Sequence, residues 1–161
     1  MLYSVMITNP HPSVKSMWRR FLEQYPQYHA SPKPEAFYFC DNENDANECA
    51  DLVIEGIKQA TSTSLWWFNK HNKPLPEAGN LYIITDWEGM AKAIVQTTKV
   101  EQVPYSDIDE AYARIEGEGD QSLEYWRKAH WAYYEREMAP FGEQPSESMI
   151  IVCEQFETIW T

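Results

Sequence analysis

The chain has 161 residues, 43% of them hydrophobic, which is enough for one domain with a substantial core. Its formal net charge of −12 argues against broad binding along the phosphates of duplex DNA, which depends on clustered lysine and arginine. Aromatic residues reach 14%, with seven tryptophans and ten tyrosines. Some of these rings are candidates to line a concave ligand site, and the alternative is an aromatic-rich core.

No targeting or membrane-spanning signal stands out in the sequence. The N-terminal stretch MLYSVMITNPHPSVK has no charged region followed by a long apolar run, and no apolar stretch approaches about 18 residues. Cys40, Cys49 and Cys153 have no C-x-x-C spacing, and three unpaired thiols fit a reducing compartment. We therefore predict a cytoplasmic protein with no membrane partner.

The first third of the chain predicts two helices on either side of a short strand. Apolar residues recur with a helical period over residues 14–25, and after a proline-containing loop the run FYFC (37–40) is a strand candidate. A second helix begins with Asn42 or Asn44 as its cap. It ends at Gly56, which occupies the position of a C-terminal capping glycine.

Further along, the pattern changes from helical periodicity to strands. Residues 80–86 and 90–103 are strand-like and are joined by a tight glycine turn, which predicts a β-hairpin. A short helix follows, for which Ser106 and Asp109 resemble a capping box. A longer helix begins after Ser122, its natural cap, and the chain ends in another strand-like segment.

The order of these elements indicates the fold class. Helices and strands do not alternate regularly, so a doubly wound parallel sheet is not predicted. An α+β domain with mostly antiparallel strands and helices packed outside fits better, and the C-terminal strand could close a small β-barrel. We predict a single domain over residues 1–161, with an N-terminal helical extension over 1–34 and a core over 35–161.

The stretch GIKQAT brings an amine and a hydroxyl within three positions of each other, directly after a helix end. A threonine hydroxyl becomes a nucleophile when a base removes its proton, and a lysine can be that base if burial lowers its pKa. Lys58 and Thr61 are therefore candidates for catalysis. The alternative is a lysine that complements the helix C-terminus and a threonine that opens a strand.

A second polar block, RIEGEGDQSLEYWRKAH, lies between the last two predicted helices. Glu116 and Glu118 flank a glycine in a turn where a partly buried carboxyl could act as a general acid, and the alternative is a solvated acidic loop. Arg127 could hold a phosphate or carboxylate with both arms of its guanidinium group, or it could pair with Glu124 or Glu116.

The histidines do not indicate a metal centre. His130 falls on an apolar helix face, which is typical of a core histidine, and the alternative is a catalytic histidine. No H-x-x-x-H or H-E-x-x-H spacing occurs, so we predict no structural zinc site and no cofactor, with Mg²⁺ or Mn²⁺ held transiently by carboxylates as the alternative. The four histidines are scattered over the chain as His11, His29, His71 and His130.

Taken together, the two polar blocks resemble the ASCH domain, a β-barrel family related to PUA domains. The first part of the resemblance is Gly-x-Lys-x-x-Thr, which here is Gly56, Lys58 and Thr61. The second is the block EGEGD-x-SL-x-x-WR-x-x-H over residues 116–130. The segment between them also resembles the longer members of the family, so the resemblance covers roughly residues 35–161.

The resemblance implies a PUA-like barrel whose cleft faces a nucleoside or RNA. In short members that hydrolyse N4-acetylcytidine, the motif threonine is taken as the nucleophile, the lysine as the proton acceptor and a glutamate as the proton donor. These roles fall on Thr61, Lys58 and Glu116, with Glu118 as a rival to Glu116. Longer members are described as RNA-binding or RNA-cleaving, which would use Lys58 and Ser122.

Two functions from different classes follow. The first is a hydrolase of an acylated nucleoside, in which Trp66, Trp67 or Tyr82 stacks on the base. The second is a module that binds short single-stranded RNA or cleaves it, in which the motif lysine, Arg127 and Lys99 meet phosphates. A third possible function is that of a ligand-sensing domain without turnover.

Two positions depart from the pattern of the short members. Ile57 stands where they often have a basic residue, and Gln59 replaces their usual threonine. Both positions flank the motif lysine, so these differences concern the substrate more than the pocket.

Overall fold

The computed structural model describes residues 10–161, so most of the N-terminal stretch for which no targeting signal was predicted lies outside the described residues. Within that range, no helix is long and apolar enough to cross a membrane. The helices are α1 (Pro12–Gln24), α2 (Glu43–Ile54), α3 (Leu65–Lys70), α4 (Glu110–Glu116) and α5 (Leu123–Met138). The strands are β1 (Glu35–Phe37), β2 (Ala60–Ser64), β3 (Leu81–Thr85), β4 (Ala91–Pro104) and β5 (Ile150–Trp160).

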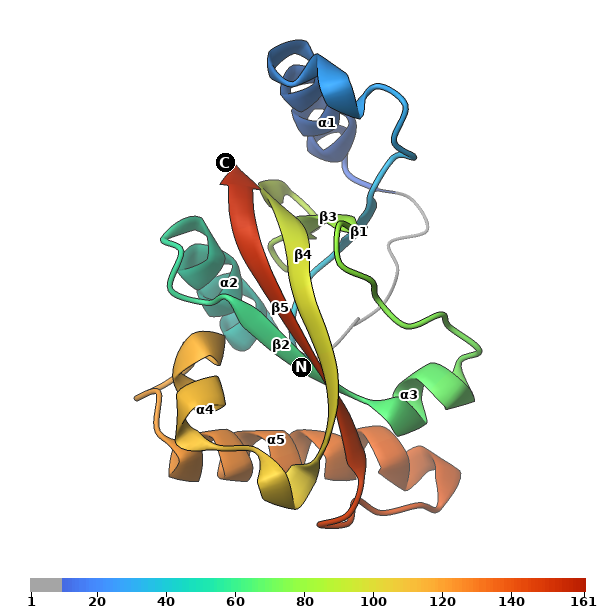
Figure 1. Cartoon of the computed structure of the whole chain (residues 1–161), viewed down its shortest axis with the longest axis vertical. Helices are drawn as coiled ribbons and strands as arrows, with labels where there is room; N and C mark the ends of the chain where they lie inside the picture. Colours follow the sequence, from blue (N-terminus) through green and yellow to red (C-terminus); the bar gives the residue numbers. More distant parts are fainter. Residues whose placement is uncertain (1–9) are drawn as a thin grey trace.

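The strands form one curved sheet in the order β1-β3-β4-β5-β2 (Figure 1). All neighbouring pairs are antiparallel except β1 with β3, so the predicted α+β class and the predicted hairpin of β3 and β4 are confirmed. The C-terminal strand β5 lies between β4 and β2. Over residues 10–161, β1 and β2 remain the edges of the sheet, which is therefore a half-barrel.

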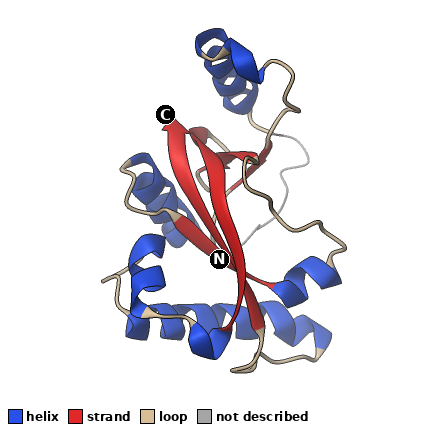
Figure 2. Cartoon of the chain, in the orientation of Figure 1, coloured by secondary structure: helices blue, strands red, loops and turns tan. Residues whose placement is uncertain are grey.

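Helices pack around this sheet at both of its ends and along one side (Figure 2). α1 lies near the C-terminal end of β5, whereas α4 and α5 lie at the opposite end (Figure 1). The apolar face of α1, with Val14, Trp18 and Phe21, forms a small core with Ile83 and Ile94 of the hairpin. The larger core lies between the sheet and the other helices, so the candidate site is built against it.

Two element boundaries differ from the predicted ones for local reasons. The first strand is Glu35–Phe37 instead of 37–40, because its parallel pairing with β3 ends at Phe37 and the chain turns at Cys40, where φ is +68°. The cap of α4 is Asp109, whose side chain accepts from the Tyr112 amide, and Ser106 lies in a preceding 3₁₀ turn. The predicted caps Asn42 and Ser122 are confirmed for α2 and α5.

The short helix α3 has no counterpart among the predicted elements. It follows β2 without a loop, because Ser64 ends the strand and also caps the helix by accepting a hydrogen bond from the Trp67 amide at 3.1 Å. The direct connection places the aromatic residues of α3 beside the end of β2.

Candidate active site

The stretch GIKQAT turns the chain from α2 into β2. Gly56 has φ +71°, the left-handed conformation that commonly follows a helix, so its predicted capping role is confirmed. The amides of Ile57 and Lys58 both donate to the Leu52 carbonyl, at 2.9 and 3.1 Å. This tight turn directs the Lys58 side chain inward, where it is fully buried.

Lys58 ends in a pocket of carboxylates and carbonyls. Its Nζ donates to Glu118 Oε1 at 2.6 Å and to the Ala60 carbonyl at 2.9 Å. Glu116 Oε1 lies 3.6 Å from the same nitrogen, and the ring of Phe39 lies 4.9 Å away. The structure therefore brings together the motif lysine and both glutamates of the second block, and we call Lys58, Glu116 and Glu118 the Lys-Glu cluster.

The cluster determines the charge of the lysine. Burial alone would lower the pKa of Lys58, but the charges of Glu118 and Glu116 outweigh it and raise the pKa above its ordinary value. The expectation that burial would lower this pKa is wrong, because the pocket holds two carboxylates beside the amine. At neutral pH Lys58 is an ammonium ion, which donates hydrogen bonds and cannot accept a proton.

Glu116 is fully buried and has partners on both oxygens. Oε2 accepts from Ser62 Oγ at 2.7 Å and from the indole nitrogen of Trp126, while Oε1 faces His130 Nε2 at 3.0 Å. Burial would raise the pKa of Glu116, but His130 and Lys58 outweigh it and hold the pKa well below the usual range. The group is therefore a carboxylate at neutral pH.

His130 belongs to this network as well as to the core. Its Nδ1 lies 2.8 Å from the Trp126 carbonyl, and its ring stacks on that of Trp126 with 4.1 Å between centroids. Sequence reasoning treated His130 as a core residue and did not assign Ser62 or Trp126 to the site. Trp126 and His130 are four residues apart on one helix face after Glu116, and this spacing could have assigned both to the site.

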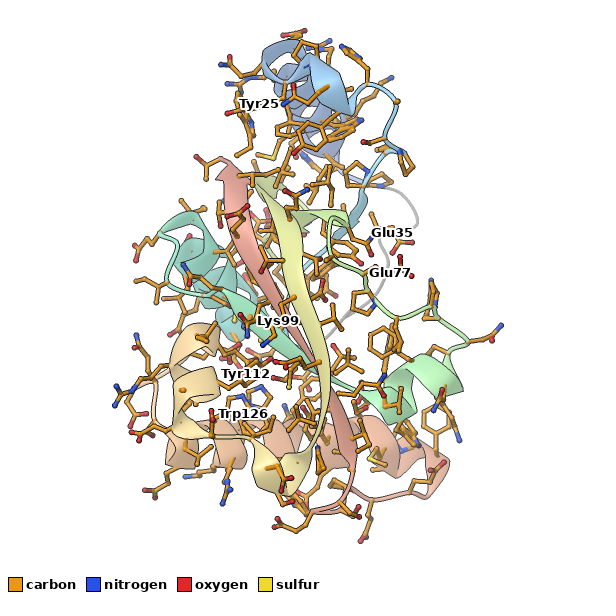
Figure 3. The ribbon with its side chains drawn as sticks, in the orientation of Figure 1. Tyr25, Glu35, Glu77, Lys99, Tyr112 and Trp126 are labelled. Carbon is orange, nitrogen blue, oxygen red and sulfur yellow. The ribbon has the colours of Figure 1, made fainter. Side chains whose placement is uncertain are left out.

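Thr61 lies on β2, next to the cluster along the chain but on the other face of the strand from Ser62. Successive side chains of a strand point to opposite faces, and Ser62 faces Glu116. Thr61 pairs across the strands with Glu154 of β5. The outer edge of β2 is held by the hydroxyl of Tyr112, which donates to the Thr61 carbonyl at 2.9 Å; Tyr112 and Trp126 are labelled in Figure 3.

A cavity of about 450 Å³ lies between α3, the start of β3 and the segments that precede β1 and β3. Two of the predicted stacking residues, Trp67 and Tyr82, line it. Trp66 points elsewhere, and its indole nitrogen donates to Glu143 at 2.7 Å. Further wall residues include Lys33, Glu35, Phe68 and Lys73.

The remaining predicted binding residues lie apart from the Lys-Glu cluster. Ser122 caps α5, with its Oγ accepting from the Tyr125 amide at 3.0 Å. Arg127 is exposed on α5, where it donates to the Ser106 carbonyl at 3.2 Å. Lys99, labelled in Figure 3, pairs with Glu101 at 2.7 Å on the surface of β4.

Glu137 on α5 is a further titratable group that the sequence did not single out. The hydroxyls of Tyr133 and Ser64 lie 3.4 and 3.5 Å from its two oxygens. Burial raises the pKa of Glu137 to about 7. In the folded protein this carboxyl therefore stays protonated until the pH approaches neutrality.

This pKa predicts a pH-dependent stability. Because the folded pKa lies above the unfolded one, the stabilisation is fully present below about pH 4.5 and is lost as the pH rises through about 7. We expect the free energy of unfolding of the wild-type protein to fall by roughly 1–3 kcal/mol between pH 5 and pH 8. In Glu137→Gln this fall should disappear, as measured by urea unfolding at both pH values. Glu135→Gln, at an exposed position of the same helix, is the control. An unchanged pH dependence in Glu137→Gln would contradict the assignment.

Comparison with known proteins identifies the family. The model of the ASCH domain matches residues 35–160. The ASCH domain from Lactobacillus crispatus JV V101 is similar with a TM-score of 0.89 and 29% identity, over 98% of this chain and 100% of that one. Protein EF3133 from Enterococcus faecalis V583 has a TM-score of 0.84 and 32% identity, over 92% of this chain and 88% of that one. A comparison with curated proteins finds no match.

A curved, mostly antiparallel sheet with helices packed outside defines a PUA-like domain, which confirms the predicted fold class. The chain belongs to the ASCH domain family. The resemblance inferred from the two polar blocks is thereby confirmed. The similarity to the Lactobacillus domain covers 98% of this chain, so it also includes α1, which precedes the residues that the family model matches.

Proposed function

We propose that this ASCH domain is an amidohydrolase that acts on an acylated nucleoside such as N4-acetylcytidine, without a metal or cofactor. The observation that carries the proposal is the buried Lys-Glu cluster at the start of the strand that bears Thr61. Desolvating such charges is costly, and buried ion pairs are often no more stabilising than apolar packing. Strongly perturbed groups of this kind concentrate at functional sites.

In this scheme Thr61 supplies the nucleophile and Lys58 supplies positive charge. Because the amine is already protonated, it is not the proton acceptor, and its positive charge is held beside the start of the strand that bears Thr61. Glu116 is ionised and its oxygens are occupied by hydrogen bonds, so we assign it, together with Glu118, to holding Lys58 charged and in place. Trp67 and Tyr82 provide aromatic surface for the base.

Turnover of N4-acetylcytidine to cytidine tests this function. We expect the wild-type protein to release cytidine and Thr61→Ala to lose at least about 1000-fold in rate. Thr98→Ala, an exposed threonine of β4, is the matched control and should retain the wild-type rate. Equal rates for Thr61→Ala and the wild type would exclude Thr61 as the nucleophile, and absence of turnover by the wild type would exclude this substrate.

Binding of short single-stranded RNA is the second candidate function. It is supported by Lys33 and Lys73, which line the same cavity as Trp67 and Tyr82 and would meet phosphates beside stacked bases. The net charge of −12 opposes strong binding. A fluorescence titration with a short oligonucleotide, in which affinity falls with salt and with Lys73→Ala, distinguishes this function from hydrolysis.

A further inference from the structure

The charge of Lys58 leaves the proposed reaction in need of a base. A threonine hydroxyl becomes an effective nucleophile only when its proton is removed as it attacks. Lys58 is an ammonium ion, and the oxygens of Glu116 are engaged by Ser62, Trp126 and His130 on the other face of β2 from Thr61. The base must therefore lie on the face to which Thr61 points.

That face carries a buried carboxylate directly opposite Thr61. Thr61 and Glu154 are register partners in the antiparallel pair of β2 and β5. Side chains of such partners lie on the same face, with Cβ atoms roughly 4.5–5.5 Å apart. Both residues are only 4% exposed. A carboxylate oxygen reaches a neighbouring hydroxyl over this separation.

Glu154 is oriented by a neighbouring strand. Thr97 of β4 donates its hydroxyl to Glu154 Oε1 at 2.6 Å, and Thr97 is itself buried. This bond uses one carboxylate oxygen and aligns the group across the sheet. In many enzymes the base that activates a nucleophile is itself oriented by a third group, and Thr97 would orient Glu154 in this way.

The same face of the sheet leads to the cavity. Tyr82 pairs with Val95, two residues before Thr97 on β4, so Tyr82 and Thr97 share this face. Tyr82 lines the cavity. Thr63, two positions after Thr61 on β2, is also buried here, and its Oγ1 has no hydrogen-bond partner among the described residues. A buried hydroxyl without a hydrogen-bond partner indicates a place where a polar group of a ligand could bind.

We propose that Glu154 is the general base that acts on Thr61, an inference that rests on the proposed hydrolase function. The carboxylate takes the Thr61 hydroxyl proton while the threonine oxygen bonds to the amide carbon and the carbonyl electron pair moves to oxygen. The pair then returns, the C–N bond breaks, and Glu154 gives the proton to the leaving exocyclic nitrogen. Water attacks the resulting threonine ester with the same base, which releases the carboxylic acid and restores Thr61.

The pH dependence of single-turnover cleavage of N4-acetylcytidine, with Glu154→Gln, tests this role. If the base is a carboxylate, the rate rises with pH through an inflection below about pH 7 and then levels. If the base is a lysine, the inflection lies above about pH 8. We expect Glu154→Gln to lose at least about 100-fold in rate while substrate binding, followed by tryptophan fluorescence, is retained. Glu157→Gln, exposed on the same strand, should retain the wild-type rate.

Two further variants separate a base from a structural residue. Glu154→Asp keeps a carboxylate and should recover part of the rate that Glu154→Gln loses. Thr97→Val removes the donor to the carboxylate and should move the inflection to higher pH. If Glu154→Gln turns over at the wild-type rate while Thr61→Ala is inactive, Glu154 is not the base, but the proposed hydrolase function stands. No turnover by the wild-type protein would overturn the hydrolase, and this inference with it.

Discussion

Lys58→Met is expected to destabilise the protein by about 3–5 kcal/mol and to abolish the proposed turnover of N4-acetylcytidine. The substitution keeps the approximate length and apolar stem of the side chain but removes the charge. Glu116 and Glu118 then remain buried in the same pocket without the ammonium ion that lies 3.6 and 2.6 Å from them. The free energy of unfolding, from urea titration of the purified variant, measures this cost.

The dependence of this loss on pH identifies its origin. Lys58 helps to hold the pKa of Glu116 low, so without it this pKa rises, and protonation of Glu116 relieves the destabilisation as the pH falls. We expect the deficit to be largest near pH 8 and smaller near pH 5. Lys99→Met removes an exposed ion pair to Glu101 and should change stability by less than about 0.5 kcal/mol. A deficit in Lys58→Met that does not vary with pH would indicate a loss of packing instead.

Gly117→Ala is expected to lower the free energy of unfolding by about 2–4 kcal/mol and to reduce the proposed turnover. Gly117 follows α4 with φ +76°, a conformation that residues with a Cβ rarely adopt. A Cβ here would also collide with the backbone carbonyl of Ile57, directly before the motif lysine. The close approach of the two polar blocks thus depends on the absence of a side chain at this position.

Gly56→Ala is the matched control for this substitution. Gly56 has φ +71°, nearly the same backbone conformation, but a Cβ there meets no atom within 4 Å. It should therefore show only the conformational cost, of about 1 kcal/mol. The difference between the two variants in urea unfolding isolates the contact with Ile57. Equal losses would show that the approach of the two blocks tolerates a methyl group.

The order of the elements could be read from the sequence because their signals are local. Asn42 and Ser122 cap helices where their types and positions predict it, and Gly56 ends α2 in the left-handed conformation. The exceptions are equally local. Ser64 serves both as the last residue of β2 and as the cap of α3, so no loop residues mark the helix start. Ser106 is of a residue type that commonly caps helices, but it belongs to a 3₁₀ turn.

The residue types of the site were also visible in the sequence, and so was the family that they suggest. The two polar blocks name Lys58 and Glu118 as candidates, and the structure joins them in an ion pair between residues 60 positions apart. What the sequence by itself determined was most of the elements, the α+β class and the presence of the two polar blocks that together suggest the family. Each depends on short-range periodicity, caps and motif spacing.

The tertiary structure alone decided the ionisation state of Lys58 and the neighbours of Thr61. The pKa of an amine in a protein depends on the balance between desolvation and nearby charge, and that balance changes sign with the number of carboxylates within a few ångströms. The neighbour of Thr61 depends on the register of β2 against β5, where a shift of one residue would replace Glu154 with a different side chain. Both are set by packing between distant segments, for which no local pattern in the sequence provides a signal.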